Sequence, residues 1–462
     1  MSGESSPNLL PPNFSKSKRI VLLCDGTWED SIRQGYAIPS NISRLARAIK
    51  PITDSGKYQM TFYHYGLGTT GNWLDKISGG AVIDQIADVY ASLAYNYIEG
   101  DEIFLFGFSR GSYMVRALCS FILDFGILTK TGMSEFASAY AAYRSGEFAV
   151  AQNKLKENGV LYTENLKVKV LGCFDTVGAL GIPHTSSDHK KYEFMNLQLS
   201  AGVEHAFHAL ALEEAREPYI PTLWFFPKGS EFDKHPERYK QTWFTGVHIN
   251  IGGGNMSKSI MGTDLLTHYL DDTATVSDKV RSETETANVL SDGTLIWMIA
   301  QCKDMLDFDI ARLHEDILSA KSRYDGEILR HANRAKEESG DLEMAPWNMG
   351  PIGDNSKLYI SLGRGTRNVG GYAPITKDQQ SIETAQYTTH ERVHQSVVVR
   401  HKRDRAVIKA LRHVDVVTES DYNTPEIVIE GTSCERNLKP VEMEVYSDFE
   451  LEFWDEELQD IQ

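Results

Sequence analysis

Apolar and polar positions along the first half of the chain follow two periods in turn. Short apolar runs predict buried strands at 19–24, 60–65, 103–106, 168–174, 222–226 and 241–247. Between them, apolar residues recur at helical spacing and predict helices over 41–49, 83–97, 114–122, 136–157 and 206–214. Strands that alternate with helices indicate an α/β fold, with a mainly parallel sheet covered by helices on both faces.

The pattern is less regular in the second half. Residues 256–340 have mostly helical spacing, with a polar loop at 273–287, and residues 341–380 are rich in Gly, Pro and Asn. A late strand is predicted at 397–399. We therefore expect a disordered N-terminus at 1–17, an α/β core at 18–255, a helical cap and irregular part of the same domain at 256–400, and a C-terminal extension with an acidic tail at 401–462.

One serine lies at a sharp junction between a predicted strand and a predicted helix. The apolar run at 103–106 leads directly into Gly107-Phe108-Ser109-Arg110-Gly111. A G-x-S-x-G pattern in this context is typical of a nucleophile elbow, in which the serine hydroxyl is exposed on a strained turn. Gly107 and Gly111 would let strand and helix approach without a Cβ clash, and the backbone N–H of Arg110 would face a substrate oxyanion. The alternative is that Ser109 only caps the helix.

Two further polar residues follow predicted strands. Asp175 comes after 168–174, and His248 comes after 241–247. Because the carboxyl ends of parallel strands share one edge of a sheet, we expect both near Ser109. The order Ser, Asp, His is that of the α/β hydrolases and predicts a nucleophile, an orienting acid and a general base. Taken singly, Asp175 could be an ordinary turn residue and His248 a core histidine.

A second oxyanion donor is expected from the loop after the first strand. That loop begins Asp25-Gly26-Thr27, where a glycine allows close approach of the backbone. Gly26 or Thr27 would donate the hydrogen bond, and Asp25 would support the loop. The alternative is a tight turn that only leads the chain out of the strand.

Composition narrows the class of protein. The 462 residues carry 47 Lys and Arg against 64 Asp and Glu, a net charge of −17, which argues against nucleic-acid binding and against attachment to an anionic membrane. The five cysteines match no metal or disulfide pattern, which favours a reducing compartment. No secretory signal and no apolar run long enough to span a bilayer is found. We expect a cytoplasmic protein of unknown oligomeric state.

Two other motifs suggest different chemistry. Residues 66–71 match G-x-G-x-x-G, but the next acidic residues, Asp84 and Asp88, fall inside a predicted helix, so we interpret 66–71 as a glycine-rich active-site loop. The stretch from His390 to His394 reads H-E-x-x-H, which binds zinc when it lies on a helix. The β-branched residues that follow favour a strand there, so a zinc metallopeptidase is kept only as an alternative.

As a set, several motifs resemble the α/β-hydrolase domain of type VI secretion lipase effectors and their uncharacterised fungal and bacterial relatives. The matching pieces are Cys24-Asp25-Gly26-Thr27-Trp28, Tyr65-Gly66-Leu67-Gly68-Thr69, Gly100-Asp101-Glu102-Ile103, Gly107-Phe108-Ser109-Arg110-Gly111-Ser112, Phe174-Asp175-Thr176-Val177-Gly178, His208-Ala209-Leu210-Ala211-Leu212 and Trp243-Phe244-Thr245-Gly246-Val247-His248. The resemblance covers about residues 18–255, more loosely to about 400, and suggests a fungal-type member. It implies the α/β-hydrolase fold, a Ser109, Asp175, His248 triad and activity on ester bonds, with phospholipase activity in the secreted effectors.

The chain departs from that family pattern after the histidine. The family usually has His-x-Asp-Val-Gly-Gly-Gly, whereas Asn250 stands here where relatives carry the carboxylate. This change puts a supporting hydrogen bond of the site in question.

The sequence as a whole predicts a lipase-like serine hydrolase. It would cleave carboxylic esters, with phospholipids or lysophospholipids as candidate substrates, through an acyl-enzyme and without a cofactor or metal. A non-catalytic binding protein that keeps the fold remains a second alternative.

Overall fold

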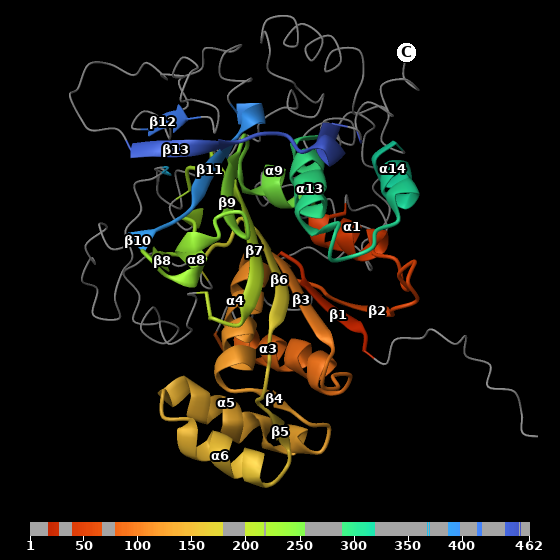
Figure 1. Ribbon diagram of the computed structural model, residues 1–462, viewed down its shortest axis with the longest axis vertical. Helices are drawn as coiled ribbons and strands as arrows, with labels where there is room; N and C mark the ends of the chain where they lie inside the picture. The colour runs from red at the N-terminus through yellow and green to blue at the C-terminus, as the bar shows by residue number, and fades with distance from the viewer. Residues whose placement is uncertain are drawn as a thin grey trace, which may run out of the picture.

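A large parallel sheet forms the centre of the computed structural model (Figure 1). The structure describes residues 17–26, 39–66, 79–178, 199–216, 219–254, 289–318, 367, 369, 387–397, 414–417, 439–451 and 453. Within them nine strands pair in parallel, and from one edge to the other they are β12 (Val414–Val417), β13 (Lys439–Glu444), β11 (Glu391–His394), β9 (Tyr239–Phe244), β7 (Val203–Ala211), β6 (Val168–Phe174), β3 (Glu102–Phe108), β1 (Arg19–Cys24) and β2 (Gln59–His64). The α/β fold predicted from the sequence is confirmed.

Helices cover both faces of this sheet. One face packs on α1 (Asn41–Ala48), α9 (His248–Gly252), α13 (Val289–Cys302) and α14 (Ile310–Leu318), and the other on α3 (Gly79–Ala94) and α4 (Arg110–Asp124). Alternate residues of β3 divide between the two cores, because Ile103 and Leu105 join one cluster and Phe104 and Phe106 the other. A sheet buried on both faces explains why its strands are continuous apolar runs in the sequence.

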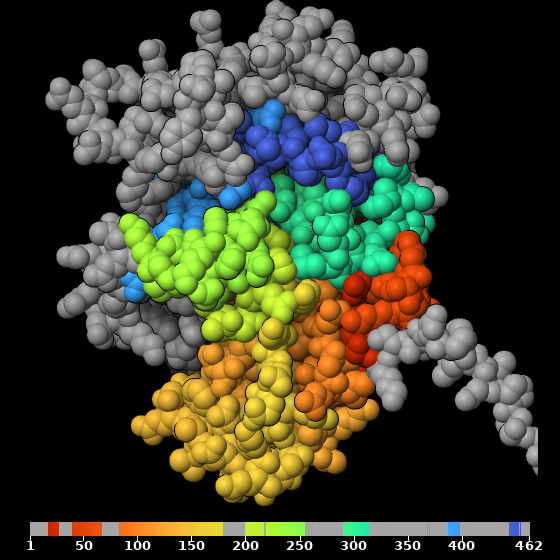
Figure 2. Space-filling model, in the orientation of Figure 1, coloured from red at the N-terminus to blue at the C-terminus, as the bar shows by residue number. Residues whose placement is uncertain are grey.

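A small lobe extends beyond α4. It contains β4 (Ile127–Leu128), η1 (Gly132–Glu135), α5 (Phe136–Ser145), α6 (Ala149–Glu157) and β5 (Leu161–Tyr162), with β4 and β5 paired antiparallel. It forms the lower end of the molecule in Figures 1 and 2. Phe121 of α4 contacts Phe136, Tyr140 and Tyr143 with ring centroids 5.0–6.1 Å apart, so the lobe is attached through aromatic packing. The single helix predicted over 136–157 is therefore two helices.

The elements predicted at 206–214 and 222–226 are also wrong. Residues 206–214 are rich in Ala and Leu, which favour helices, yet 203–211 form β7 in the middle of the sheet, where pairing with β6 and β9 decides the structure. The predicted strand at 222–226 is largely absent, because only Phe226 enters β8 (Phe226–Pro227), which pairs with β10 (Tyr387–Thr388). The carbonyls of Thr222 and Leu223 accept hydrogen bonds from the Arg116 guanidinium instead of from a neighbouring strand.

The C-terminal half contributes to the same sheet. Strands β11, β13 and β12 extend it beyond β9, so the sheet includes residues on both sides of the boundary expected at 255. Val397, expected in a strand, lies in a helical turn instead. Residues 1–16, Thr27, the loop 273–287 and the acidic residues after 453 lie outside the described part of the chain.

The order of the strands has a switch point at β1. Because β1 lies between β2 and β3, the direction of chain progression reverses there, and in open α/β sheets ligands bind at the carboxyl ends of strands at such a switch point. A Cβ on Gly111 would lie 2.2 Å from the Cys24 carbonyl oxygen, and one on Gly107 would lie 2.6 Å from the Gly111 backbone. These two glycines therefore let α4 begin directly against the ends of β1 and β3, as the sequence predicts.

The described residues include no helix with the length and apolar character that a bilayer crossing requires. Four cysteines, Cys24, Cys119, Cys173 and Cys302, are free and buried. Burial raises the pKa of the Cys173 thiol to about 11, which keeps this thiol protonated and unreactive.

Candidate functional site

Ser109 occupies a strained turn between β3 and α4. Its backbone has φ 58° and ψ −123°, a region that residues with a side chain rarely adopt. The side chain makes no capping hydrogen bond to α4, although Ser109 stands at the N-cap position. The interpretation of this serine as an ordinary helix cap is therefore wrong, and its hydroxyl is available for another partner.

That partner is His248, the first residue of α9. The Ser109 Oγ lies 2.7 Å from Nε2 of His248, and Nδ1 of the same ring lies 2.6 Å from Oδ2 of Asp175. A carboxylate can only accept a hydrogen, so Nδ1 carries the proton and Nε2 accepts from the serine. Three residues that the sequence places after separate strands thus form one hydrogen-bonded chain, in the order expected of nucleophile, base and acid.

Asp175 lies at the buried end of this chain. Its Oδ1 accepts from the Ala211 backbone N–H at 3.0 Å, and its side chain is completely buried. The Arg367 guanidinium donates from one nitrogen to Oδ1 at 2.5 Å and from the other to Oδ2 at 2.9 Å. Burial alone would raise the pKa of Asp175, but the charge of Arg367 and the hydrogen bond from His248 outweigh it and hold that pKa well below its usual range.

The His248 ring is enclosed by aromatic rings. Phe108 and Tyr219 lie against it with ring centroids 4.8 and 4.9 Å away. Burial lowers the pKa of His248 and the neighbouring Asp175 opposes that shift, with a net lowering. The imidazole is therefore neutral at neutral pH, which is the form that can accept a proton from a hydroxyl.

Acidic residues after β7 hold the turn that carries His248. The backbone N–H of His248 donates to Oε2 of Glu214 at 3.2 Å, and that of Gly246 donates to Glu213. Glu214 is itself bound by Arg216 in a two-pronged pair at 2.8 and 2.9 Å. The position of His248 is thus determined by the end of the neighbouring strand β7 as well as by the end of β9.

Asn250 makes the supporting hydrogen bond, although it stands where relatives carry a carboxylate. Its Oδ1 accepts from the backbone N–H of Val247 at 3.0 Å, and the residue is completely buried. An amide oxygen serves here as a carboxylate oxygen would, so the turn before His248 is closed without a negative charge.

Of the residues expected to stabilise an oxyanion, the structure describes Arg110 and Gly26. As the first residue of α4, Arg110 has a backbone N–H without an intrahelical acceptor. The Gly26 N–H donates to Oδ1 of its neighbour Asp25 at 2.7 Å. Oδ2 of Asp25 accepts from the Ser40 and Tyr63 hydroxyls, both at 2.6 Å, so Asp25 is held between the start of α1 and the end of β2. Thr27, the other expected donor, lies outside the described residues.

The H-E-x-x-H sequence does not form a metal site. Residues 391–394 are strand β11, in which positions four apart are separated by about 13 Å, so the two imidazoles cannot converge on one ion. His390 stacks on Phe226, whereas His394 stacks on Phe244. The zinc-peptidase alternative is therefore wrong. Of the motif 66–71, only Gly66 is described.

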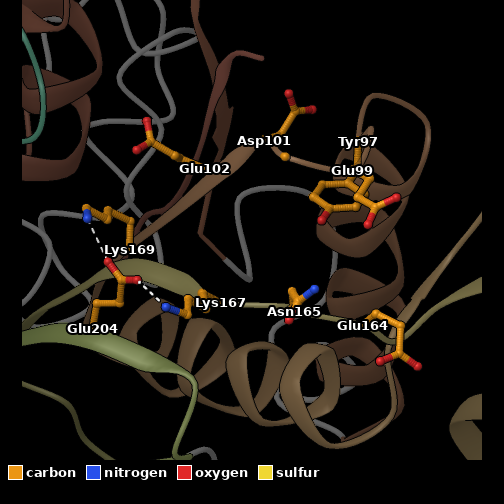
Figure 3. Close-up of a pocket in the computed structure, with 10 residues that line it drawn as sticks. Tyr97, Glu99, Asp101, Glu102, Glu164, Asn165, Lys167, Lys169 and Glu204 are labelled. Atoms are coloured by element: carbon orange, nitrogen blue, oxygen red, sulfur yellow. Dashed lines mark hydrogen bonds and ion pairs between the residues drawn. The ribbon is translucent and has the colours of Figure 1, made fainter. Parts of the chain in front are cut away.

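A polar pocket lies at the amino ends of the parallel strands, whereas Ser109 lies at their carboxyl ends (Figure 3). It has a volume of about 350 Å³ and is lined in part by Glu102, Lys169 and Glu204, from the amino ends of β3, β6 and β7. Glu204 pairs there with Lys169 at 2.6 Å and with Lys167 at 3.1 Å. Glu102 pairs with Lys57 and Arg19 instead, and the pocket lies at the opposite ends of the strands from Ser109.

Two supporting residues were not identified from the sequence. His208 in β7 accepts from the Thr176 N–H at 3.0 Å and so fixes the backbone that follows Asp175. Arg367 lies in a Gly- and Asn-rich stretch without periodicity, so no local pattern marks it. Only the tertiary structure brings it to Asp175.

Comparisons with known proteins identify the family of the chain. Residues 18–301, more than half of the chain, match the family model described as "T6SS, Phospholipase effector Tle1-like, catalytic domain". An uncharacterized protein of Saccharomyces cerevisiae, YEL023C, is 28% identical over 260 residues, which are 48% of this chain and only 36% of the yeast protein.

Solved structures give more distant matches. A Tle1 effector bound to the VgrG spike of the type 6 secretion system is 15% identical with a TM-score of 0.37, over 84% of this chain and 93% of that one. An uncharacterized protein from Pseudomonas aeruginosa is 15% identical with a TM-score of 0.33, over 73% and 56%. Because the family model matches more than half of the chain, the chain belongs to the Tle1-like phospholipase effector family, and residues 18–301 match the catalytic domain of that family.

Proposed function

We propose that the protein is a serine hydrolase that cleaves the carboxylic esters of phospholipids or lysophospholipids. The observation that carries this proposal is the hydrogen-bonded chain from Ser109 through His248 to Asp175. Membership of a phospholipase family supports the choice of lipid esters. No step of the proposed reaction uses a metal or cofactor.

In the first half of the reaction, the Ser109 Oγ attacks the ester carbonyl carbon. His248 Nε2 takes the hydroxyl proton, and Asp175 stabilises the resulting imidazolium. The Arg110 N–H at the start of α4 donates to the oxyanion. Gly26 or Thr27 is the second donor, and the Gly26 N–H would have to release Asp25 or share its hydrogen between the two acceptors. The intermediate then expels the alcohol, which receives the proton from His248, and leaves an acyl group on Ser109.

Water completes the cycle. His248 removes a proton from water, the hydroxide attacks the acyl carbonyl, and Ser109 leaves with the proton returned by the imidazole. The products are a fatty acid and an alcohol, which for a phospholipid is a lysophospholipid. The lowered pKa of His248 keeps this base neutral and ready at neutral pH.

The Arg110 side chain supports a negatively charged substrate. It is partly buried directly beside the nucleophile, and among the described residues no carboxylate pairs with its guanidinium. An arginine in partly buried surroundings is stabilised by an anion, and phosphate fits its planar donors well. We infer that Arg110 binds the phosphate of a phospholipid head group.

The proposed activity predicts hydrolysis of phospholipid vesicles. Purified protein should release fatty acid and lysophospholipid, measured by mass spectrometry, and Ser109→Ala should abolish release. A chelator should leave the rate unchanged because no metal takes part. Folded wild-type protein that hydrolyses no lipid or simple ester would favour the non-catalytic binding protein.

The inference on Arg110 predicts a change of substrate preference. Arg110→Gln keeps the backbone N–H and removes the charge. It should lower kcat/KM for a phospholipid by about tenfold or more. The loss of kcat/KM for an uncharged short-chain ester should be smaller. Arg238→Gln serves as a control. It removes an exposed charge just before β9, at the amino ends of the strands and far from the carboxyl ends that carry Ser109. Equal losses on both substrates would contradict a role in phosphate binding.

The acid of the triad can be tested against its neighbour Asn250. Asp175→Asn should reduce kcat by roughly 10⁴-fold, because an amide can neither hold the same tautomer nor stabilise the imidazolium. Asn250→Asp preserves the acceptor for Val247 and should leave kcat level or raise it. The measurement is turnover of a chromogenic ester by variants with the same circular dichroism spectrum. A nearly silent Asp175→Asn would show that another residue is the acid.

A further inference from the structure

A buried arginine contacts the catalytic acid from a distant part of the chain. Arg367 lies beyond residues 18–301, to which the family match extends. Its guanidinium is 1% exposed and the Asp175 side chain is fully buried, so the pair is excluded from water.

The Arg367 guanidinium also binds backbone carbonyls close to the triad. Besides the two hydrogen bonds to Asp175, it donates to the carbonyls of Ala211 at 2.7 Å and Tyr219 at 2.5 Å. Ala211 also donates its N–H to Asp175, and Tyr219 packs its ring on His248. Arg367 therefore ties together the acid and two backbone segments that surround the base.

We propose that Arg367 is a positioning residue of the triad, which clamps Asp175 in the orientation that receives the hydrogen bond from His248. This inference rests on the hydrolase function proposed above. A planar fork that engages both carboxylate oxygens fixes rotation of the carboxyl group, which one hydrogen bond cannot do. It also makes a segment outside the family-matched region necessary for full activity.

The clamp has an electrostatic consequence for the base. His248 is faced by Asp175 from the end of β6 and by Tyr219. Glu214 and Arg216, which follow β7, also face it. The charge of Asp175 is in turn neutralised by Arg367. Arg216 and Glu214 bind each other, so their effects on His248 largely cancel.

His208 lies behind Asp175. Burial lowers its pKa to about 3, so this imidazole remains neutral through the working range of pH. Removing the Arg367 charge would leave Asp175 less neutralised and would raise the pKa of His248. Because the reaction requires neutral His248, the acid limb of the pH–rate profile would then move to higher pH.

The test compares Arg367→Gln, Arg367→Lys and wild type by pH profiles of kcat/KM on a chromogenic ester. Arg367→Gln should lose about 10²-fold in kcat through misplacement of the base, and its acid limb should rise by about one pH unit. Arg367→Lys keeps a positive charge but not the fork, so it should keep the acid limb near that of wild type and still lose kcat.

Arg116→Gln is the matched control. Arg116 is also a buried arginine that donates to backbone carbonyls, those of Thr222 and Leu223, and it is not part of the proposed triad. Its loss should lower the melting temperature without moving the acid limb. An Arg367→Gln variant that behaves in the same way would show a structural role only and would overturn the proposal.

A double-mutant cycle gives a second readout. In an Asp175→Asn background the clamp has no carboxylate to position, so adding Arg367→Gln should cost much less in kcat than it does in the wild-type background. Additive losses would contradict the proposal. If wild-type protein turned over no ester at all, the proposed function would fail, and that outcome is distinct from either result for Arg367.

Discussion

A fully buried carboxylate is the constraint around which the site is built. Asp175 is removed from water, and an ionised carboxyl in such surroundings persists only when charge and hydrogen bonds compensate for lost hydration. His248, Ala211 and Arg367 provide that compensation. Because each donor comes from a different part of the chain, the ionised carboxylate depends on β7, α9 and Arg367 being in place together.

The sheet topology makes this assembly possible. β3, β6, β7 and β9 are neighbours and run in the same direction, so the residues that follow them meet at one edge. Ser109 follows β3, Asp175 follows β6, Glu213 and Glu214 follow β7, and His248 follows β9. Gly107 and Gly111 then allow α4 to start at this edge, which directs the Ser109 hydroxyl toward the imidazole. Site geometry is thus a consequence of strand order and of two residues without a Cβ.

The parts predictable from the sequence were those with a local signal. A strand, G-x-S-x-G and a helix adjoin in sequence, so the elbow at Ser109 could be identified directly. Asp175 and His248 could be placed near it because parallel strands share an edge. The helix predicted over 206–214 was wrong because Ala and Leu favour helices while neighbouring strands determine the actual structure. Arg367 could not be predicted, since its role depends on a contact 192 residues away in sequence.

Covalent labelling of Ser109 is the sharpest test of whether His248 and Asp175 activate its hydroxyl. A fluorophosphonate reacts with a serine only where a base removes the hydroxyl proton and an oxyanion hole stabilises the adduct. Peptide mapping by mass spectrometry after labelling should find one adduct, on Ser109, with fluoride lost. Labelling should be abolished by Ser109→Ala and strongly slowed by His248→Ala. Folded wild-type protein that takes no label, or that is labelled on a different serine, would contradict the account.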